Sequence, residues 1–270
     1  MGCTIGAVYR EDGDVFLFKN LDQIGHSTYH PPEIRQGKRF KYVHLSSCRD
    51  PNGIGVWAGV NAAGVAVLGA DGNTITNFTG RGWSSLNDTL ECYQSILETS
   101  GSLYEGLDLI IRFYQAHRVG GNGDLVIIAD RNDAVVIEYA TDRWGLMFRN
   151  GAPYLIRSNF FLALSGVRPA PEENSLYLSC ALRYQTGMTH LSRTAGNTTL
   201  DDVMALLRNH DHGPSAMSIC RHGGKGEYLT ECSFIAHLGP KHIDSYTVIN
   251  GYPCESSYRK LTLDYSAELI

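Results

Sequence analysis

Pairs of short apolar runs joined by tight turns are the feature that most restricts how this chain can fold. Runs at 3–9 and 15–19 flank Arg10-Glu-Asp-Gly-Asp14, runs at 55–60 and 65–68 flank Asn61-Ala-Ala-Gly64, and runs at 124–129 and 134–139 flank Asp130-Arg-Asn-Asp133. Tight turns join antiparallel strands, whereas parallel neighbours need a crossover of about a dozen residues. The sequence therefore predicts largely antiparallel sheets.

Helical segments interrupt the strands at two places. Ser85-Leu-Asn-Asp88 and Ser102-Leu-Tyr-Glu105 resemble capping boxes, and each precedes apolar residues at helical spacing. Further helices are predicted over about 175–188 and from Thr199 to near His210. The remaining predicted strands are 40–45, 145–149, 153–158, 230–237, 245–249 and 258–263.

The order of these elements indicates a layered α+β fold. Two antiparallel sheets stacked face to face, each covered outside by helices, accommodate every segment in four αββα layers. Because no linker is visible, the 270 residues are predicted to form a single domain over 1–270. The polar, Pro-broken stretch 23–38 is predicted to be a loop that borders a pocket.

Composition argues against several classes of partner. Hydrophobic residues make up 43% of the chain, the net charge is −5, and no run of Lys or Arg occurs, which disfavours nucleic acid and anionic membranes. No stretch reaches the roughly 18 apolar residues of a membrane span. No basic segment followed by an apolar run marks a signal peptide, so we expect a cytoplasmic protein that acts on a small molecule.

The seven cysteines do not suggest a metal centre or a redox motif. They are scattered and form no C-x-x-C pair, so most are expected to be small buried hydrophobic residues. His210-Asp-His212 could suggest metal ligands, but it falls at a predicted helix end with no third ligand in view. The sequence therefore predicts no metal and no cofactor.

Cys3 differs from the other cysteines in its position near the start of the chain. An N-terminal cysteine can use its own α-amine as general base, and the ordinary pKa of that amine, about 7.7–8.0, is close to the thiol's value of about 8.5. Met1 and Gly2 must leave before the amine of Cys3 is free. Gly2 has no Cβ and so permits the backbone strain that self-cleavage requires. Cys3 is therefore a candidate nucleophile.

Several blocks of the sequence resemble those of one enzyme family. Gly2-Cys3-Thr4 followed by Lys19-Asn20-Leu21-Asp22 resembles the cysteine N-terminal nucleophile (Ntn) hydrolases, which include choloylglycine (bile salt) hydrolases, penicillin V acylases and acyl-CoA:6-aminopenicillanic acid acyltransferases. The later blocks are most similar to the acyltransferase group; they are Gly59-Val-Asn-Ala-Ala-Gly64, Tyr154-Leu-Ile-Arg-Ser-Asn159-Phe-Phe, Ser218-Ile-Cys-Arg-His222 and Gly251-Tyr-Pro-Cys254-Glu. The resemblance covers essentially the whole chain and implies the same αββα sandwich.

The resemblance also implies roles for individual residues. Asp22 would accept a hydrogen bond from the freed amine of Cys3, and Asn159 would donate to the oxyanion of the tetrahedral intermediate. Arg183 would support both the nucleophile and Asp22. Two simpler interpretations stay open at this point, because Asp22 could cap a turn at a strand end and Arg183 could be a solvated charge on its helix.

Three positions depart from the family pattern. Lys19 stands where bile salt hydrolases have Arg, which keeps the charge that lowers a thiol pKa but loses bidentate geometry. Asp71 stands where they have an oxyanion-binding Asn; an ionised carboxylate would repel an oxyanion, so the second donor is expected to be a backbone N–H, that of Gly72. The block Thr-Asn-His-Phe reads Ser-Asn-Phe-Phe and keeps only Asn159.

Together these features predict an enzyme that cleaves a linear carbon–nitrogen amide bond through a thioester on Cys3, exposed by autoprocessing. Acyl transfer from the same thioester to an amine is an alternative, as is a processed peptidase or peptide amidase. An inactive binding or scaffold protein with the same fold is a third. A homo-oligomer is expected.

Overall fold

Two antiparallel sheets form the centre of this computed structural model, which describes residues 2–25, 28–47, 55–72, 83–84, 86–119, 123–140, 143–164 and 174–266. The first sheet runs in the order β12 (Tyr154–Arg157), β1 (Gly2–Tyr9), β2 (Val15–Ile24), β13 (Tyr228–Leu238), β14 (His242–Ile249) and β15 (Arg259–Asp264). Every neighbouring pair in it is antiparallel, as the tight turns predicted.

The second sheet is larger and also antiparallel throughout. Its order is β11 (Arg143–Phe148), β10 (Ala134–Ala140), β9 (Asp124–Ala129), β6 (Ala66–Asp71), β5 (Gly55–Asn61), β4 (Lys41–Ser47) and β3 (Ile34–Gln36). A short parallel pair, β7 (Trp83–Ser84) and β8 (Arg118–Val119), stands apart from it. Strand β3 lies inside the stretch 23–38 that was expected to be a loop, so that prediction was wrong for these residues.

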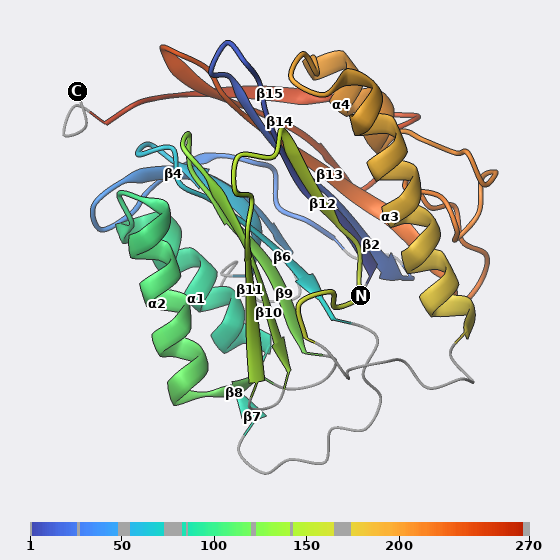
Figure 1. Cartoon of the computed structure of the whole chain (residues 1–270), viewed down its shortest axis with the longest axis horizontal. Coiled ribbons are helices and arrows are strands. Elements are labelled where there is room, and N and C mark those ends of the chain that lie inside the picture. Colours follow the sequence, from blue (N-terminus) through green and yellow to red (C-terminus); the bar gives the residue numbers. More distant parts are fainter. Residues whose placement is uncertain are drawn as a thin grey trace.

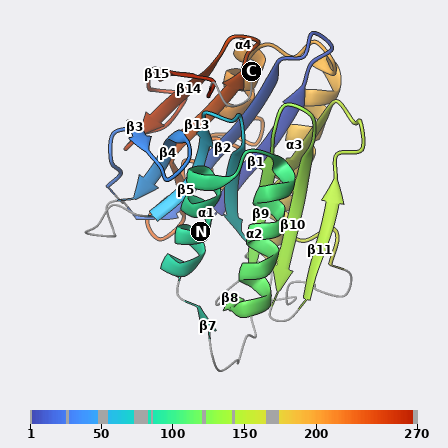
Figure 2. The same ribbon diagram turned by 90° about the vertical axis from the view of Figure 1, so that its left-hand side faces the viewer.

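Helices cover the outer face of each sheet (Figures 1 and 2). Helices α1 (Leu86–Thr99) and α2 (Leu103–Ala116) pack on the larger sheet, and α3 (Asn174–Thr194) and α4 (Leu200–Leu207) pack on the smaller one. The predicted four-layer αββα sandwich of the α+β class is therefore confirmed.

Local signals placed the helix starts better than the helix ends. The Ser102 side chain accepts from the Glu105 N–H, and Thr199 and Asp202 form a capping box. Ser85 lies outside the described residues. Helix α3 continues to Thr194, past the predicted end at 188, because Leu191 is buried against the sheet. Helix α4 ends at Leu207, before His210.

Strand β2 also runs further than the sequence indicated. It was expected to end at Lys19 but continues to Ile24, with Asn20 and Asp22 fully buried. The side-chain amide of Asn20 donates to the carbonyls of Leu207 and Ile219, which satisfies its buried N–H groups. Tertiary hydrogen bonds thus keep polar residues inside β2, although the sequence suggested that the strand ends before them.

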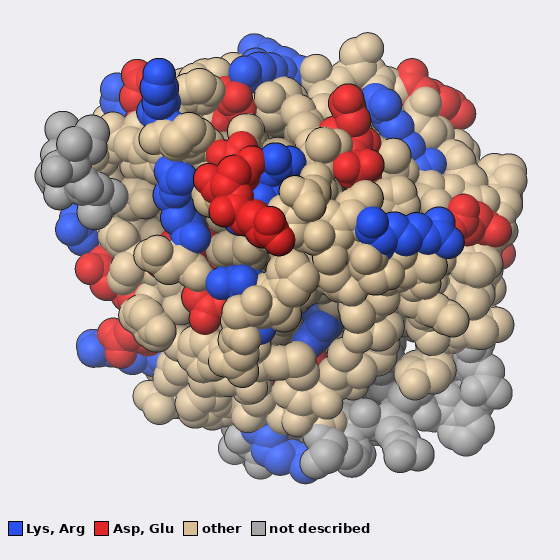
Figure 3. Space-filling model, turned by 45° about the horizontal axis from the view of Figure 1, so that its top comes forward, with Lys and Arg blue, Asp and Glu red and all other residues tan. Residues whose placement is uncertain are grey.

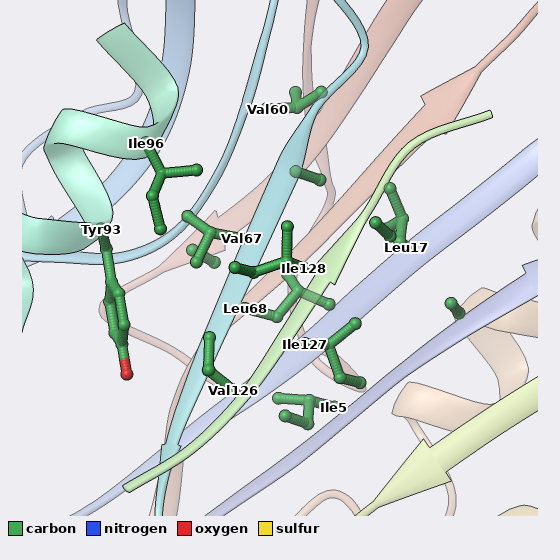
Figure 4. Close-up of a cluster of buried hydrophobic side chains, with 14 of the residues drawn as sticks. Ile5, Leu17, Val60, Val67, Leu68, Tyr93, Ile96, Val126, Ile127 and Ile128 are labelled. Carbon is green, nitrogen blue, oxygen red and sulfur yellow. The ribbon is translucent and has the colours of Figure 1, made fainter. Parts of the chain in front are cut away.

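The main apolar core lies between the sheets and continues to α1. Ile5 and Leu17 of the smaller sheet face Leu68 and Ile127 of the larger one, while Val67, Val126 and Ile128 point to Tyr93 and Ile96 of α1 (Figure 4). A second cluster, including Phe16, Phe18, Leu206 and Leu207, lies between the smaller sheet and helices α3 and α4. Because strand residues alternate between faces, odd-numbered residues of β1 and β2 point into the inter-sheet core.

Asp124 is a buried acid in the larger sheet. Its carboxylate accepts from the hydroxyls of Tyr93, at 2.6 and 2.7 Å, and Tyr114, at 2.5 Å. Burial raises the pKa of Asp124 to about 6, although the hydrogen bonds from Tyr114 and Tyr93 act against the shift. Native Asp124 therefore binds its proton more tightly than the unfolded chain does.

This difference makes folding stability depend on pH in a defined direction. Between about pH 4 and pH 6 the native state holds more protons at this site, so stability falls as pH rises, by about 3 kcal/mol in total. We expect the unfolding free energy of the wild type, minus that of Asp124→Asn, to fall by this amount across the interval. Urea titrations at several pH values measure it. A constant difference would contradict the prediction.

The surface carries charges of both signs. On the face shown in Figure 3, basic and acidic side chains are interspersed and neither forms a continuous surface. In the part of the chain that the structure describes, no helix combines the length and apolar character needed to cross a membrane.

Candidate active site

Cys3 lies near the start of β1 with its side chain in the inter-sheet core and no solvent exposure. It is paired with Leu21 of β2, and its backbone N–H donates to Asn159 Oδ1 at 2.6 Å. Its carbonyl accepts from Arg183 Nη1 at 2.5 Å. Both backbone polar groups of Cys3 are therefore held by side chains distant in sequence.

Lys19 lies beside the thiol. It is opposite Ile5 in the β1–β2 register, so it points into the same core, where it is fully buried. Its Nζ is 3.1 Å from Cys3 Sγ and also donates to the Gly69 carbonyl. Burial raises the pKa of the Cys3 thiol, and the Lys19 charge opposes that rise. Lys19 is thus the group that favours the thiolate.

Removing that charge should make the thiolate harder to form. In Lys19→Met the thiol pKa rises further, so we expect alkylation of Cys3 by iodoacetamide near neutral pH to slow by about tenfold or more. Peptide mass mapping of the alkylated protein across a pH series measures this independently of any substrate. Lys41→Met, at an exposed position of β4, is the control. An unchanged alkylation profile in Lys19→Met would show that Lys19 does not tune the thiol.

Asp22 is surrounded by donors. Its Oδ1 accepts from Thr230 Oγ1 at 2.8 Å, and its Oδ2 lies 3.4 Å from Arg221 Nη1 and 3.9 Å from Arg183 Nη1. It sits within β2 between Gly2 of β1 and Thr230 of β13. The interpretation of Asp22 as a turn cap at a strand end is therefore excluded.

Arg183 is a buried residue of α3 that points at the start of β1. It has no exposed surface, so it is not the solvated helix charge that the sequence left open. Besides the Cys3 carbonyl it donates to Thr4 Oγ1 at 3.1 Å, to Asn159 Oδ1 at 3.0 Å and to Ser179 Oγ at 3.4 Å. One guanidinium thereby fixes the main chain of Cys3 and the side chain of Asn159, a task suited to its rigid fork of donors.

Asn159 follows β12 and bridges the two sheets. Its Oδ1 accepts from the Cys3 N–H and from Arg183, and its Nδ2 donates to the Asp71 carbonyl at 2.8 Å. Because Arg183 can only donate, it fixes which end of the amide is the oxygen. The amide NH₂ therefore lies on the side of Asp71, at the end of β6.

Gly72 follows Asp71 at the end of β6, and its backbone N–H was expected to be the second oxyanion donor. The Gly72 N–H donates to the Gly123 carbonyl at 3.3 Å, so it is directed to the backbone of the larger sheet. The negative charge of Asp71 contributes to raising the pKa of the Cys3 thiol. The geometry thus gives no support to Gly72 as an oxyanion donor, and Asp71 takes part through its carbonyl bond to Asn159.

Gly2 occupies the space next to Asp22. A Cβ at position 2 would collide with the Arg221 guanidinium and approach Asp22 Oδ2 to 3.1 Å. Only glycine fits here without displacing Arg221.

Sequence reasoning missed Arg221 and Thr230. Arg221 is 2% exposed, and burial and the neighbouring Arg183 charge lower its pKa while Asp22 opposes the shift. The Arg221 N–H donates to Thr230 Oγ1 at 2.9 Å, so the two residues approach Asp22 as a pair. A charged residue between Cys220 and His222, inside a block that resembled the family, was the available signal for Arg221.

A group of side chains able to hold a metal lies in the same part of the smaller sheet but outside this site. It comprises His210, Cys220, His222 and Cys254. His212, the other histidine of the motif noted in the sequence, is 3.1 Å from Thr186 Oγ1 and is not part of the group.

Known structures share this fold at low sequence identity. No protein-family model and no curated protein matches the chain. Penicillin V acylase from Agrobacterium tumefaciens is 12% identical with a TM-score of 0.57, covering 97% of this chain and 86% of its own.

Two variants of the conjugated bile acid hydrolase from Clostridium perfringens are also similar. They are 11% and 10% identical with TM-scores of 0.57 and 0.55, and the match covers 97% and 98% of this chain and 92% and 98% of theirs. The resemblance to Ntn hydrolases noted in the sequence is therefore confirmed at the level of the fold: this chain has the αββα fold of penicillin V acylase and conjugated bile acid hydrolase.

Proposed function

We propose that this protein is an amidohydrolase that cleaves a linear carbon–nitrogen amide bond with Cys3 as an N-terminal nucleophile. The observation that carries the proposal is the position of the Cys3 thiol, 3.1 Å from a buried ammonium and on a backbone held by Asn159 and Arg183. Two enzymes that share the fold are named for amide substrates, penicillin V and conjugated bile acids, which supports this reaction class.

The burial of charge around Cys3 favours an enzyme over a scaffold. Lys19, Asp22, Arg183 and Arg221 are each at most 2% exposed. Removing such groups from water costs free energy that apolar side chains of similar volume would not require. Clusters of this kind are characteristic of functional sites.

The first proposed step exposes the amine of Cys3. The Cys3 thiol attacks the Gly2 carbonyl, the Gly2–Cys3 amide bond breaks as a thioester forms, and the amide nitrogen takes up a proton. Water then hydrolyses the thioester and releases Met1-Gly2. In this proposal Asp22, which is paired with Gly2 across β1 and β2, orients the new α-amine.

Amide hydrolysis then follows from the same atoms. The α-amine takes the thiol proton, the thiolate attacks the substrate carbonyl, and the Asn159 amide donates to the oxyanion. The protonated amine gives its proton to the leaving nitrogen, and water hydrolyses the acyl-enzyme. Arg183 holds Asn159 and Cys3 in place throughout, and Lys19 stabilises the thiolate.

Acyl transfer is the second candidate. The sequence blocks after the first 22 residues are most similar to those of acyltransferases, and the thioester is common to both reactions. The ratio of amide product to free acid, measured with a nucleophilic amine added in increasing concentration, separates the two.

Intact mass spectrometry of the purified chain tests the processing step. A chain that begins at Cys3 supports the proposal, and a chain that retains Gly2 contradicts it. A variant lacking Gly2 provides a check on the chemistry, because methionine aminopeptidase alone can then expose Cys3. If that variant hydrolyses amides and the wild type retains Gly2, only the autoprocessing step fails.

Substrate classes are compared with the processed protein. N-acyl amino acids, penicillin V and conjugated bile acids cover the acyl and amine halves that the fold relatives suggest. Hydrolysis of none of these by a chain that begins at Cys3 would count against the amidohydrolase assignment.

A further inference from the structure

Four potential metal ligands meet at one end of the smaller sheet, beyond the proposed active site. His210 follows α4, Cys220 and His222 lie before β13, and Cys254 lies between β14 and β15. One ligand atom from each residue lies within 4.8 Å of every other. Segments far apart in the sequence therefore converge with their side chains on one point.

Two of the separations between ligand atoms are close to the edge length of a metal tetrahedron. His222 Nε2 is 3.6 Å from Cys220 Sγ and 3.3 Å from Cys254 Sγ. With metal–sulfur bonds of about 2.3 Å and metal–nitrogen bonds of about 2.0–2.1 Å, tetrahedral geometry requires a sulfur–nitrogen edge of about 3.6 Å. The side chains are thus spaced so that an ion could sit between them.

The hydrogen-bonding state of the group supports a ligand at this point. His210 Nε2 is buried and has no hydrogen-bond partner among the described residues. A buried polar atom without a partner is costly. Cys220 and Cys254 are both free thiols. Metal coordination would satisfy the thiolates and a histidine nitrogen together.

The backbone around the ligands is already held in place. Arg208 Nε donates to the Pro253 carbonyl at 2.8 Å, which joins the end of α4 to the segment that carries Cys254. The Cys220 N–H donates to the Asn209 carbonyl at 3.1 Å. Tyr252 stacks on the His222 ring with 3.8 Å between ring centroids and fixes its orientation.

We propose that His210, Cys220, His222 and Cys254 form a structural Zn²⁺ site. Two thiolates and two imidazoles in a tetrahedron are the ligand set that zinc prefers, and hard cations such as Mg²⁺ and Ca²⁺ favour oxygen ligands. Four protein ligands close the coordination sphere, so the ion has a structural role. Arg221 lies between two of the ligands and contacts Asp22, so the ion would also hold Arg221 against Asp22.

Metal content tests the proposal directly. Protein expressed with zinc and desalted should carry about one zinc per chain by inductively coupled plasma mass spectrometry. Cys254→Ser and His210→Gln should fall below about a tenth of an equivalent. His212→Gln and Cys92→Ser are matched controls, one a neighbouring histidine outside the group and the other a buried cysteine of α1, and both should keep their zinc.

Cobalt substitution reports the geometry. Wild-type protein stripped with a chelator and refilled with Co²⁺ should show the strong visible bands of tetrahedral cobalt and a thiolate-to-cobalt charge-transfer band. Both should be absent in Cys254→Ser. If the ligand variants do not fold, titrating the wild-type thiols with an organomercurial should release about one equivalent of zinc to a colorimetric indicator.

Two results would overturn the proposal. One is wild-type protein that binds neither zinc nor cobalt after reduction and exposure to the metal. The other is an intact mass showing a Cys220–Cys254 disulfide that persists in the reduced cytoplasm of the expression host. Neither result depends on amide hydrolysis, so the failure of this proposal and the failure of the proposed function are distinguishable.

Discussion

Cys3→Ala should lower the rate of amide hydrolysis by about 10³-fold or more, because the thioester of the proposed mechanism forms on the Cys3 sulfur. Cys3→Ser should also be severely impaired, since a hydroxyl is a much weaker acid than a thiol at the pH where the α-amine is an effective base. The measurement is the steady-state rate on whichever amide the processed wild type hydrolyses fastest. Both substitutions change little volume, so melting temperatures should stay close to the wild type.

Cys92→Ala is the matched control for this prediction. Cys92 is a buried cysteine on α1, so the substitution removes a buried thiol outside the site. It should keep wild-type activity. Retained activity in Cys3→Ala would exclude Cys3 as the nucleophile, and with it the proposed mechanism.

Asn159→Ala should lower kcat by about 10²–10³-fold, the usual cost of losing one oxyanion donor. The substitution also removes the acceptor that holds the Cys3 N–H and one Arg183 N–H. Part of the loss would therefore come from a less ordered nucleophile. Pre-steady-state kinetics on an ester substrate, which reports acylation directly, measures the effect.

A second measurement separates the two contributions. If Asn159 only positions Cys3, the Cys3 alkylation rate should fall together with kcat. If it stabilises the oxyanion, alkylation should be nearly unchanged while acylation falls. Asn132→Ala, at an exposed turn between β9 and β10, is the control. Wild-type kcat in Asn159→Ala would exclude Asn159 as the oxyanion donor.

Much of the fold was predictable because its signals are local. Tight turns between apolar runs determine which strands are antiparallel neighbours, and capping residues such as Ser102 and Thr199 mark helix starts. These interactions span a few residues. The larger errors are in the predicted ends of β2 and α3, where tertiary contacts extend the element beyond its local signal. In β2, Asp22 is held by Thr230, and in α3, Leu191 is buried in the core.

The candidate site was only partly predictable. Cys3, Asp22 and Asn159 stand in recognisable blocks, and Arg183 was noted through the same resemblance. Arg221 was not identified, because nothing local in the sequence shows that a residue before β13 reaches β2. Gly72 was expected to donate to the site, but its N–H donates to the Gly123 carbonyl just beyond the pairing of β6 with β9.

The four proposed zinc ligands show most clearly the difference between what local sequence signals reveal and what tertiary contacts reveal. Residue types and spacing alone did not identify further metal ligands for His210. The other members of the group, Cys220, His222 and Cys254, lie 10, 12 and 44 residues further along the chain. The sequence by itself determined the order of the longer strands and the helices and the nucleophile candidate, because short-range patterns and one residue's own amine and thiol are sufficient for these. Only the tertiary structure decided which distant charges and ligands surround Cys3, Asp22 and His210, because those contacts depend on how the sheets and their connecting loops pack.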